Sequence, residues 1–445
     1  MIEHFLGADT GKRYRIEREL GRGGEGVVYL VTDADSKTPF AAKWCKPSPR
    51  LERQRQQIDT LVHRGPPLID DPGIHFIWPL EALSSIDSPE GTGYLMPLID
   101  TQRFVTINQI SNGRGPAQPA LPVLCRVSYR LATALESLHA AGLAYCDINQ
   151  GNIRIDPKQG EIVISDNDNV IVNHAPAQVR GVWEFMAPEI ALGQAIPNAE
   201  SDLYSVAILL YYLWMWEHPM EGKETLQLYS WDIPAKKKYF AQEPVFVFHP
   251  TNPVNSAVGI PELALHVARW RRLCAPRLKA MFNHTFIDGI HQPAKRKRLS
   301  DWRRLFLELE ANAPTCACGA VNLWDGESKP LKCWRCERVI PLRLCLETDL
   351  GHSGQTILLA YPGAILRRHH LDTASFNVAS TEPLAIQEPH PKEPGQLIVR
   401  NRSAATWGYR TSNGQLLELE PDQARALIPG VELHVGPRVV RVRQV

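Results

Sequence analysis

The 445-residue sequence has almost no net charge, with 49 lysines and arginines against 48 aspartates and glutamates. This balance excludes a global field that attracts nucleic acid or an acidic membrane, so any polyanion must be bound locally. Long apolar runs are also lacking. The longest, residues 203–216, includes Ser205 and three tyrosines and is shorter than the roughly 20 residues that span a bilayer. We expect a buried helix there.

The N-terminus lacks the basic segment and apolar core of a secretory signal. The nine cysteines are an odd number, and four of them lie within residues 316–336. This clustering favours metal ligation in a reducing cytoplasm over a disulfide framework. We therefore expect a cytoplasmic protein.

The length exceeds what one hydrophobic core usually organises, and it predicts two or three domains. The first half alternates β-rich and helical runs, and a helix is predicted from Leu124 to Gly142. Helices dominate residues 189–310, and short alternating strands follow Cys345. The expected fold class is α+β, with a small all-β domain at the C-terminus.

A glycine-rich segment, residues 21–28 (GRGGEGVV), lies between two predicted strands and fits G-x-G-x-x-G-x-V. Glycines let backbone N–H groups approach phosphate oxygens. The same glycine pattern is also compatible with a turn that has only a structural role. Lys43 lies on the next predicted strand, and its separation in sequence from the glycine segment suits a lysine that binds phosphate. Without the glycine segment, this lysine would be interpreted as a solvated residue at a sheet edge.

Three further motifs follow in order. Asp147 and Asn152 have the spacing of the H-R-D-L-x-x-x-N loop and come directly after the long helix. Asp166 stands where the D-F-G aspartate is expected, and residues 187–189 read Ala-Pro-Glu. This ordered set indicates phosphoryl transfer from a nucleotide.

Residues 13–311 therefore resemble the eukaryotic-like (Hanks-type) protein kinase family, which implies a bilobal fold with lobes at 13–97 and 98–311, after an N-terminal extension at 1–12. The resemblance implies that Asp147 accepts the substrate hydroxyl proton and that Asn152 and Asp166 hold Mg²⁺. Met96 looks like the gatekeeper, and the Ile99 N–H like an adenine donor. The implied ATP-binding residues are Gly21, Gly23, Gly24, Gly26, Val28, Ala41, Lys43, Met96, Ile99, Asn152 and Asp166.

The resemblance also implies structural roles. Glu189 is expected to pair with an arginine near the end of the domain, for which Arg298 is our candidate. Asp202 resembles the aspartate that supports the catalytic loop. Asp59 lies at a plausible helical distance to be the partner of Lys43, although it is shorter than the usual glutamate.

Several positions depart from the family pattern. Tyr145-Cys146 replaces His-Arg, and residues 167–188 contain no serine, threonine or tyrosine, so we expect no activation by phosphorylation of this loop. Asn149 and Val182 replace a lysine and a threonine that normally interact with the catalytic aspartate. Asp168 replaces the D-F-G glycine, either as an added metal ligand or as a group that repels Asp166.

Two thiolate pairs, Cys316 with Cys318 and Cys333 with Cys336, have the layout of a structural Cys₄ zinc ribbon, predicted over residues 312–345. Four unligated cysteines are the alternative. The remaining residues, 346–445, faintly resemble the later strands of a forkhead-associated β-sandwich. An unspecialised β-sandwich that contacts proteins is equally compatible with them.

The catalytic-loop sequence, the Asp-x-Asp segment and the cysteines together look like a bacterial subgroup associated with tellurite-resistance-type phosphorylation triads. This resemblance implies a von Willebrand A-type protein and a PP2C-type phosphatase as partners. We predict an ATP- and Mg²⁺-dependent protein kinase, with serine or threonine favoured over tyrosine, that binds structural Zn²⁺ and neither nucleic acid nor membrane. A pseudokinase scaffold and a small-molecule kinase are the alternatives.

Overall fold

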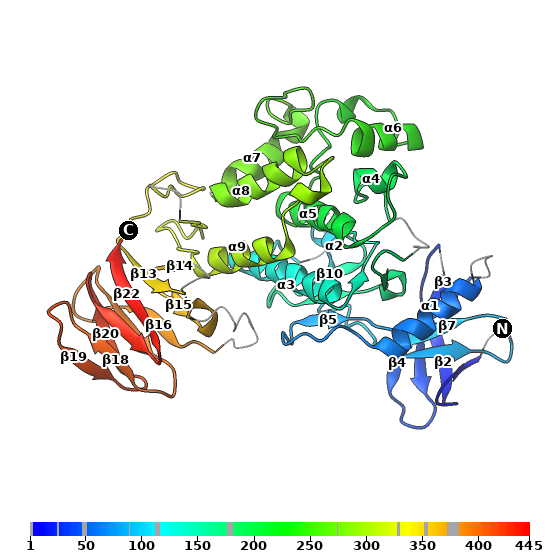
Figure 1. Cartoon of the computed structure of the whole chain (residues 1–445), viewed down its shortest axis with the longest axis horizontal. Coiled ribbons are helices and arrows are strands. Elements are labelled where there is room, and N and C mark those ends of the chain that lie inside the picture. Colours follow the sequence, from blue (N-terminus) through cyan, green and yellow to red (C-terminus); the bar gives the residue numbers. More distant parts are fainter. Residues whose placement is uncertain are drawn as a thin grey trace.

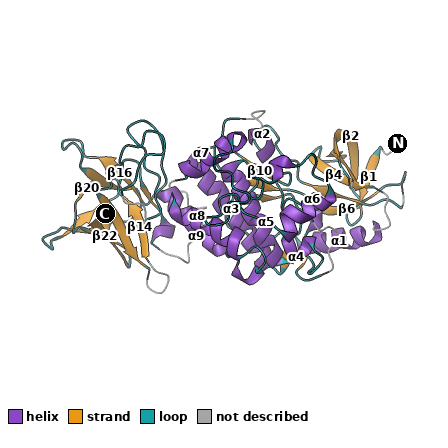
Figure 2. Cartoon of the chain, turned by 90° about the horizontal axis from the view of Figure 1, so that it is seen from above, coloured by secondary structure: helices purple, strands orange, loops and turns teal. Residues whose placement is uncertain are grey.

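The computed structural model describes residues 3–24, 26–46, 51–88, 90–111, 116–175, 181–273, 275–326, 330–350, 355–371 and 382–445. A strand-rich N-terminal part, a helical middle part and a strand-rich C-terminal part follow one another along the molecule (Figure 1). Figure 2 shows the helices gathered between the two strand-rich ends. Among the described residues, none of the helices combines the length and apolarity needed to cross a bilayer.

The N-terminal part is a closed barrel with strand order β1-β2-β3-β4-β7-β6. The first strand pairs with both β2 and β6, and its Phe5 is fully buried. The N-terminal residues are thus part of this lobe, and the expected boundary before residue 13 is wrong. The strands are β1 (His4–Gly7), β2 (Arg13–Arg22), β3 (Gly26–Asp33), β4 (Pro39–Cys45), β6 (Glu81–Ser84) and β7 (Gly93–Met96).

One helix, α1 (Leu51–Arg64), accompanies the barrel. Its polar sequence carries a narrow apolar face, and Ile58 and Leu61 on that face are buried. The carbonyl of Leu61 accepts a hydrogen bond of 2.9 Å from the Trp78 indole. The helix is thereby attached to the segment that leads into β6 of the barrel.

The helical lobe is built around α3 (Leu121–Ala140), α5 (Ala199–Met215) and α9 (Leu299–Ala311). Residues 206–211 of α5 are fully buried, which confirms the buried helix expected from the apolar run. The other helices are α2 (Ile107–Ser111), α4 (Pro188–Ala191), α6 (Ile233–Lys237), α7 (Ala264–Arg272) and α8 (Pro276–Asn283).

A small sheet of order β5-β11-β10-β8 lies at the side of this lobe that meets the barrel. Its strands β10 and β11 form a hairpin around residues 156–160. The chain enters β10 directly after Asn152 and leaves β11 shortly before Asp166. The strands of the lobe are β5 (Ile74–Phe76), β8 (Val105–Thr106), β9 (Leu143–Ala144), β10 (Ile153–Ile155), β11 (Ile162–Ile164) and β12 (Ile171–Val172).

The C-terminal part packs two sheets around one apolar core, and its β-rich character is as the alternating pattern predicts. The sheet orders are β14-β13-β22-β21-β18-β19 and β15-β16-β17-β20. The strands are β13 (Leu344–Asp349), β14 (Gln355–Leu359), β15 (Ile365–Leu366), β16 (Ala385–Pro389), β17 (Leu397–Asn401), β18 (Trp407–Arg410), β19 (Leu416–Leu419), β20 (Ala424–Leu427), β21 (Glu432–Val435) and β22 (Arg438–Gln444).

Asn312, directly after α9, joins the helical lobe to this β-sandwich. Its side-chain amide donates to the Ile357 carbonyl at 3.0 Å and its oxygen accepts from the Leu359 N–H at 2.6 Å. Because Asn312 is buried, these bonds replace solvent at the junction. The segment that contains the four clustered cysteines, residues 312–343, begins here; we call it the cysteine segment.

Candidate active site and cysteine cluster

Lys43 lies on β4 opposite Val28 of β3 and Tyr94 of β7. It is 6% exposed, and its ammonium lies 2.8 Å from Asp168 and 3.7 Å from Asp166. Desolvation lowers the pKa of Lys43, but the negative potential of Tyr94, Asp168 and Asp166 holds that pKa well above its ordinary value. The lysine is therefore a fixed, buried cation.

The expectation that Asp59 pairs with Lys43 is wrong. The Asp59 carboxylate, on α1, makes no hydrogen bond or ion pair with a described residue, and the His63 ring lies 2.7 Å from the Asp59 backbone carbonyl instead. Asp168 instead receives Lys43 on one oxygen and the Tyr94 hydroxyl, at 2.9 Å, on the other. Asp168, which we expected to be either a metal ligand or a group that repels Asp166, is thus the partner of Lys43.

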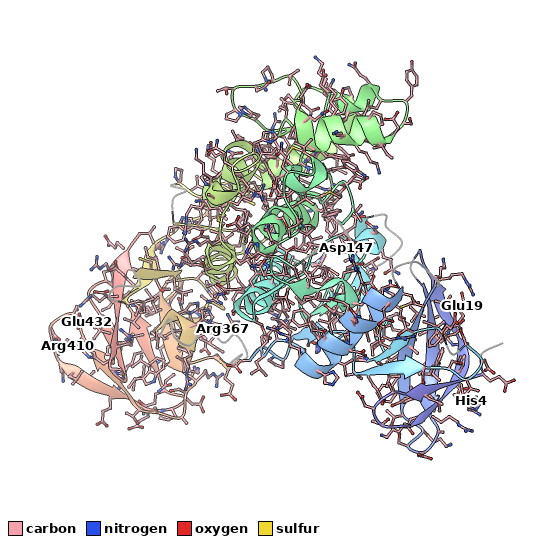
Figure 3. The ribbon with its side chains drawn as sticks, turned by 45° about the vertical axis from the view of Figure 1, so that its right-hand side comes forward. His4, Glu19, Asp147, Arg367, Arg410 and Glu432 are labelled. Atoms are coloured by element: carbon pink, nitrogen blue, oxygen red, sulfur yellow. The ribbon has the colours of Figure 1, made fainter. Side chains whose placement is uncertain are left out.

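Asp147 lies in the loop after β9 and is held by asparagines. Asn152 donates to its Oδ2 at 3.1 Å and Asn149 to its Oδ1 at 3.2 Å. Asn169 reaches the same Oδ2 at 3.4 Å from the turn that begins at Asp166. The asparagine at 149 therefore contacts Asp147 where the family's lysine is expected. Figure 3 shows Asp147 on the side of the helical lobe that faces the barrel.

The loop is anchored from below by Asp202, near the start of α5. Its buried carboxylate accepts the backbone N–H groups of Tyr145 at 2.7 Å and Cys146 at 3.1 Å, and also contacts the His139 ring at 3.0 Å. Cys146 has a left-handed backbone with φ of 67°. Such a conformation is uncommon outside glycine and needs this kind of external support.

Asp166 also has a left-handed backbone, with φ of 53°. Its side chain is 46% exposed, in contrast to the buried Asp168. Carboxylate and amide oxygens are the ligands Mg²⁺ takes in proteins. The side-chain oxygen atoms of Asp166 and Asn152 therefore fit a magnesium ion. The Asp168 carboxylate is instead engaged in its ion pair with Lys43.

The glycine segment joins β2 to β3, and all of it except residue 25 is described. A Cβ on Gly26 would lie 2.5 Å from the Trp44 carbonyl oxygen, so only glycine fits at this position. A Cβ on Gly21, Gly23 or Gly24 would meet nothing within 4 Å. These glycines leave open space at the loop, as close approach of a ligand requires.

The expected adenine contacts cluster with these groups. Met96 pairs with Ala41 across β7 and β4, on the same face as Lys43 because strand side chains alternate. Both belong to one apolar cluster, against which Val28 and Ile99 pack. This cluster offers an apolar surface next to the lysine.

Arg154 is a candidate active-site residue that the sequence motifs did not reveal. It stands between the buried Ile153 and Ile155 of β10, so strand alternation turns it away from the core. Desolvation lowers its pKa and Asp166 opposes that shift, and its guanidinium has no ion-pair partner among the described residues. The signal was available: a charged residue two positions after Asn152 interrupts an apolar strand.

The expectation that Glu189 pairs with Arg298 is also wrong. Arg296 forms the bidentate pair, with both N–O distances at 2.7 Å, and its side chain is 0% exposed. Arg298 instead precedes α9, and its backbone N–H bonds to Asp301 at 3.1 Å. The Ala-Pro-Glu segment is thereby fixed to the end of the helical lobe.

The four cysteines of the cysteine segment converge. Their sulfur atoms all lie within 4.8 Å of one another, with Cys316–Cys336 and Cys318–Cys333 at 3.6 Å. A tetrahedral zinc thiolate site needs sulfur atoms about 3.8 Å apart, given Zn–S bonds of about 2.3 Å. The donor set thus fits a zinc ion.

Backbone groups prepare one of these thiols for deprotonation. Burial opposes the thiolate of Cys333, but hydrogen bonds from the N–H groups of Cys336 and Arg335 and from the Cys318 and Cys316 thiols lower the Cys333 pKa to about 6. The Asn322 amide also lies 3.8 Å from this sulfur. Donors around a sulfur favour the metal-binding form.

Residues 107–300 match the family model described as a protein kinase domain. The match includes Asp147, Asn152 and Asp166. The match begins after Lys43 and the glycine segment, so the assignment of these residues to the site depends on the geometry described above.

The curated relatives are serine/threonine kinases. The serine/threonine-protein kinase PknA of Mycobacterium tuberculosis is 29% identical over 232 residues, 50% of this chain and 51% of that protein. The serine/threonine-protein kinase PksC of Streptomyces coelicolor is 25% identical over 49% of this chain and 40% of its own length. The chain spans about half the length of the curated relatives it matches, or less. The PknI kinase domain of Mycobacterium tuberculosis aligns over 66% of this chain and 95% of its own, with 18% identity and a TM-score of 0.41.

Proposed function

We propose that this protein is an ATP- and Mg²⁺-dependent kinase that phosphorylates protein hydroxyl groups, serine or threonine before tyrosine. The observation that carries the proposal is the set Lys43, Asp147, Asn152 and Asp166, which contains two pairs in contact. Lys43 lies 3.7 Å from Asp166, and Asn152 donates to Asp147 at 3.1 Å. Phosphoryl transfer depends on positioning and charge neutralisation, which these groups supply.

Each residue has a separate task in this mechanism. Lys43 would hold the α/β-phosphates, and Asn152 and Asp166 would hold Mg²⁺, which neutralises phosphate charge when bound. Asp147 would orient the substrate hydroxyl and accept its proton. The three asparagines that donate to Asp147 fix the orientation of its carboxylate.

The test is radiolabel transfer from ATP to a protein acceptor by wild type, Asp147→Ala and Asp166→Ala, with Asp59→Ala as the matched control. We expect loss of transfer by at least about a hundredfold in Asp147→Ala, because general acid–base groups contribute 10²–10⁴-fold. We expect a strong loss in Asp166→Ala as well, because that variant lacks a proposed Mg²⁺ ligand. The control should retain activity. Equal transfer by all four proteins would refute the assigned roles.

The second candidate is a nucleotide-binding scaffold without transfer. It is favoured by one contact: Asp168, an acidic residue in place of the D-F-G glycine, occupies the Lys43 ammonium at 2.8 Å. Retained ATP binding with no label on any protein would support the scaffold. Label on a metabolite alone would indicate a small-molecule kinase.

We propose further that loop phosphorylation does not switch this kinase on. Residues 167–188 lack hydroxyl side chains, and Cys146 stands where the phosphate-docking arginine is expected. Within that stretch, residues 176–180 lie outside the described part. Phosphatase pretreatment should leave activity unchanged, and lost activity with a phosphosite mapped to this stretch would contradict the proposal.

For the remaining regions we propose a structural Zn²⁺ in the cysteine segment and a protein-contact role for the β-sandwich. The supporting observation for zinc is the set of four converging thiols. The proposed partners are a von Willebrand A-type protein and a PP2C-type phosphatase, in the cytoplasm. A pull-down that compares the full chain with one lacking residues after 345 tests whether the sandwich recruits them, including through a forkhead-associated type of phosphopeptide contact.

A further inference from the structure

An open groove lies between α7 of the helical lobe and the cysteine segment, away from the candidate active site. Its volume is about 1210 Å³, larger than the 300–1,000 Å³ typical of small-molecule pockets. Figure 1 shows the chain after α9 passing beside α7 and α8 on its way to β13. The groove has room for an extended peptide.

Positive charge gathers on this groove although the whole chain is nearly neutral. Arg271 and Lys332 are exposed, and Arg272 is half-buried. None of these three makes an ion pair with a described residue, and the only carboxylate among the lining residues is Glu337. Arg269, in contrast, is engaged, because it donates to the Met215 carbonyl at 3.0 Å.

Arg272 is held in place by the cysteine segment. Its guanidinium lies 3.9 Å from the centre of the Trp334 ring, and that indole donates to the Val321 carbonyl at 2.8 Å. The Arg272 Nε is buried and has no hydrogen-bond partner. The fixed guanidinium places a positive charge on the wall of the groove.

The same groove has an apolar wall along α7. Leu265 is 59% exposed, and Ile260, Ala264 and Ala268 also line the groove. An apolar wall beside positive charges suits an amphipathic protein segment better than a nucleic acid, whose regularly spaced phosphates require a longer cationic track.

We propose that this groove binds an extended acidic segment of a partner protein, with carboxylates on Arg271, Arg272 and Lys332 and an apolar side chain against Leu265. The cysteine segment supplies one wall of the groove, and Trp334 holds Arg272 in place. The inference is independent of phosphoryl transfer.

The test uses the full-length protein and a short fluorescent peptide of alternating glutamate and leucine, with binding followed by anisotropy. The double variant Arg271→Glu/Lys332→Glu reverses two exposed charges and should weaken binding at least about tenfold. The control is Arg304→Glu, an exposed arginine on α9 that does not line the groove, and it should bind like wild type.

Two further measurements keep the proposal falsifiable. Replacement of the peptide leucines by serine should weaken binding, because the apolar contact with Leu265 is lost. Absence of peptide binding, equal binding by the double variant and the control, or tighter binding of a single-stranded oligonucleotide than of the peptide would each overturn the proposal.

Discussion

Lys43 and Asp168 are 125 positions apart in the sequence, and their side chains meet at 2.8 Å. The lysine comes from the barrel and the aspartate from the helical lobe, so this ion pair bridges the two lobes at the candidate site. The buried Tyr94 hydroxyl fixes the second oxygen of the same carboxylate at 2.9 Å. Asp168, and not a residue of α1, therefore sets the position of the lysine.

The first prediction concerns this pair. Asp168→Asn removes the charge that holds Lys43 and should lower the rate of phosphoryl transfer about tenfold or more, since charge-assisted hydrogen bonds contribute about 1.5–3 kcal/mol. Steady-state transfer at saturating ATP is the measurement. Asp59→Asn is the control, and equal losses in the two variants would contradict the assignment of Asp168.

The second prediction separates the two arginines near Glu189. Arg296→Ala leaves the Glu189 carboxylate without its buried partner and should reduce the stability of the helical lobe by about 3 kcal/mol. Arg298→Ala, in the turn before α9, should cost less than about 1 kcal/mol. Urea unfolding followed by far-UV circular dichroism measures both. Similar midpoints for the two variants would rule out the Arg296 pair as the anchor.

The third prediction concerns pH. Desolvation, with help from Glu217 and Glu184, raises the pKa of Glu221 from 4.5 to about 7. The folded state then binds more protons than the unfolded state between those values, so this group destabilises the fold as pH rises from about 4.5 to 7. Glu221→Gln should therefore raise the melting temperature relative to wild type at pH 8 but not at pH 4.5. An identical difference at both pH values would show that Glu221 does not titrate in this way.

The fourth prediction concerns the metal. Purified protein should contain one zinc per chain, and Cys316→Ser should lose it while Cys345→Ser, outside the cluster, retains it. Because protons compete with zinc for the thiolates, the zinc content should fall as the pH is lowered. Elemental analysis after dialysis at several pH values measures this. Zinc-free wild type prepared with added zinc would contradict the site.

Local patterns in the sequence carried much of the site. The glycine segment, the spacing between Asp147 and Asn152 and the two cysteine pairs are features in which neighbours along the chain act together. Such features are readable because backbone geometry fixes their relative positions within a few residues. The burial of α5 was predictable for a similar reason, since it follows from the apolar run formed by its own residues.

The tertiary structure alone decided which distant charges meet. Asp59 was a reasonable partner for Lys43 by helical position, but Asp168 approaches the ammonium from the other lobe. Arg296 and Arg298 are two residues apart in the sequence. The turn into α9 directs the Arg296 side chain inward to Glu189, whereas Arg298 bonds to Asp301 through its backbone N–H at the start of the helix. Side-chain partners across lobes depend on chain packing, which the order of residues does not express.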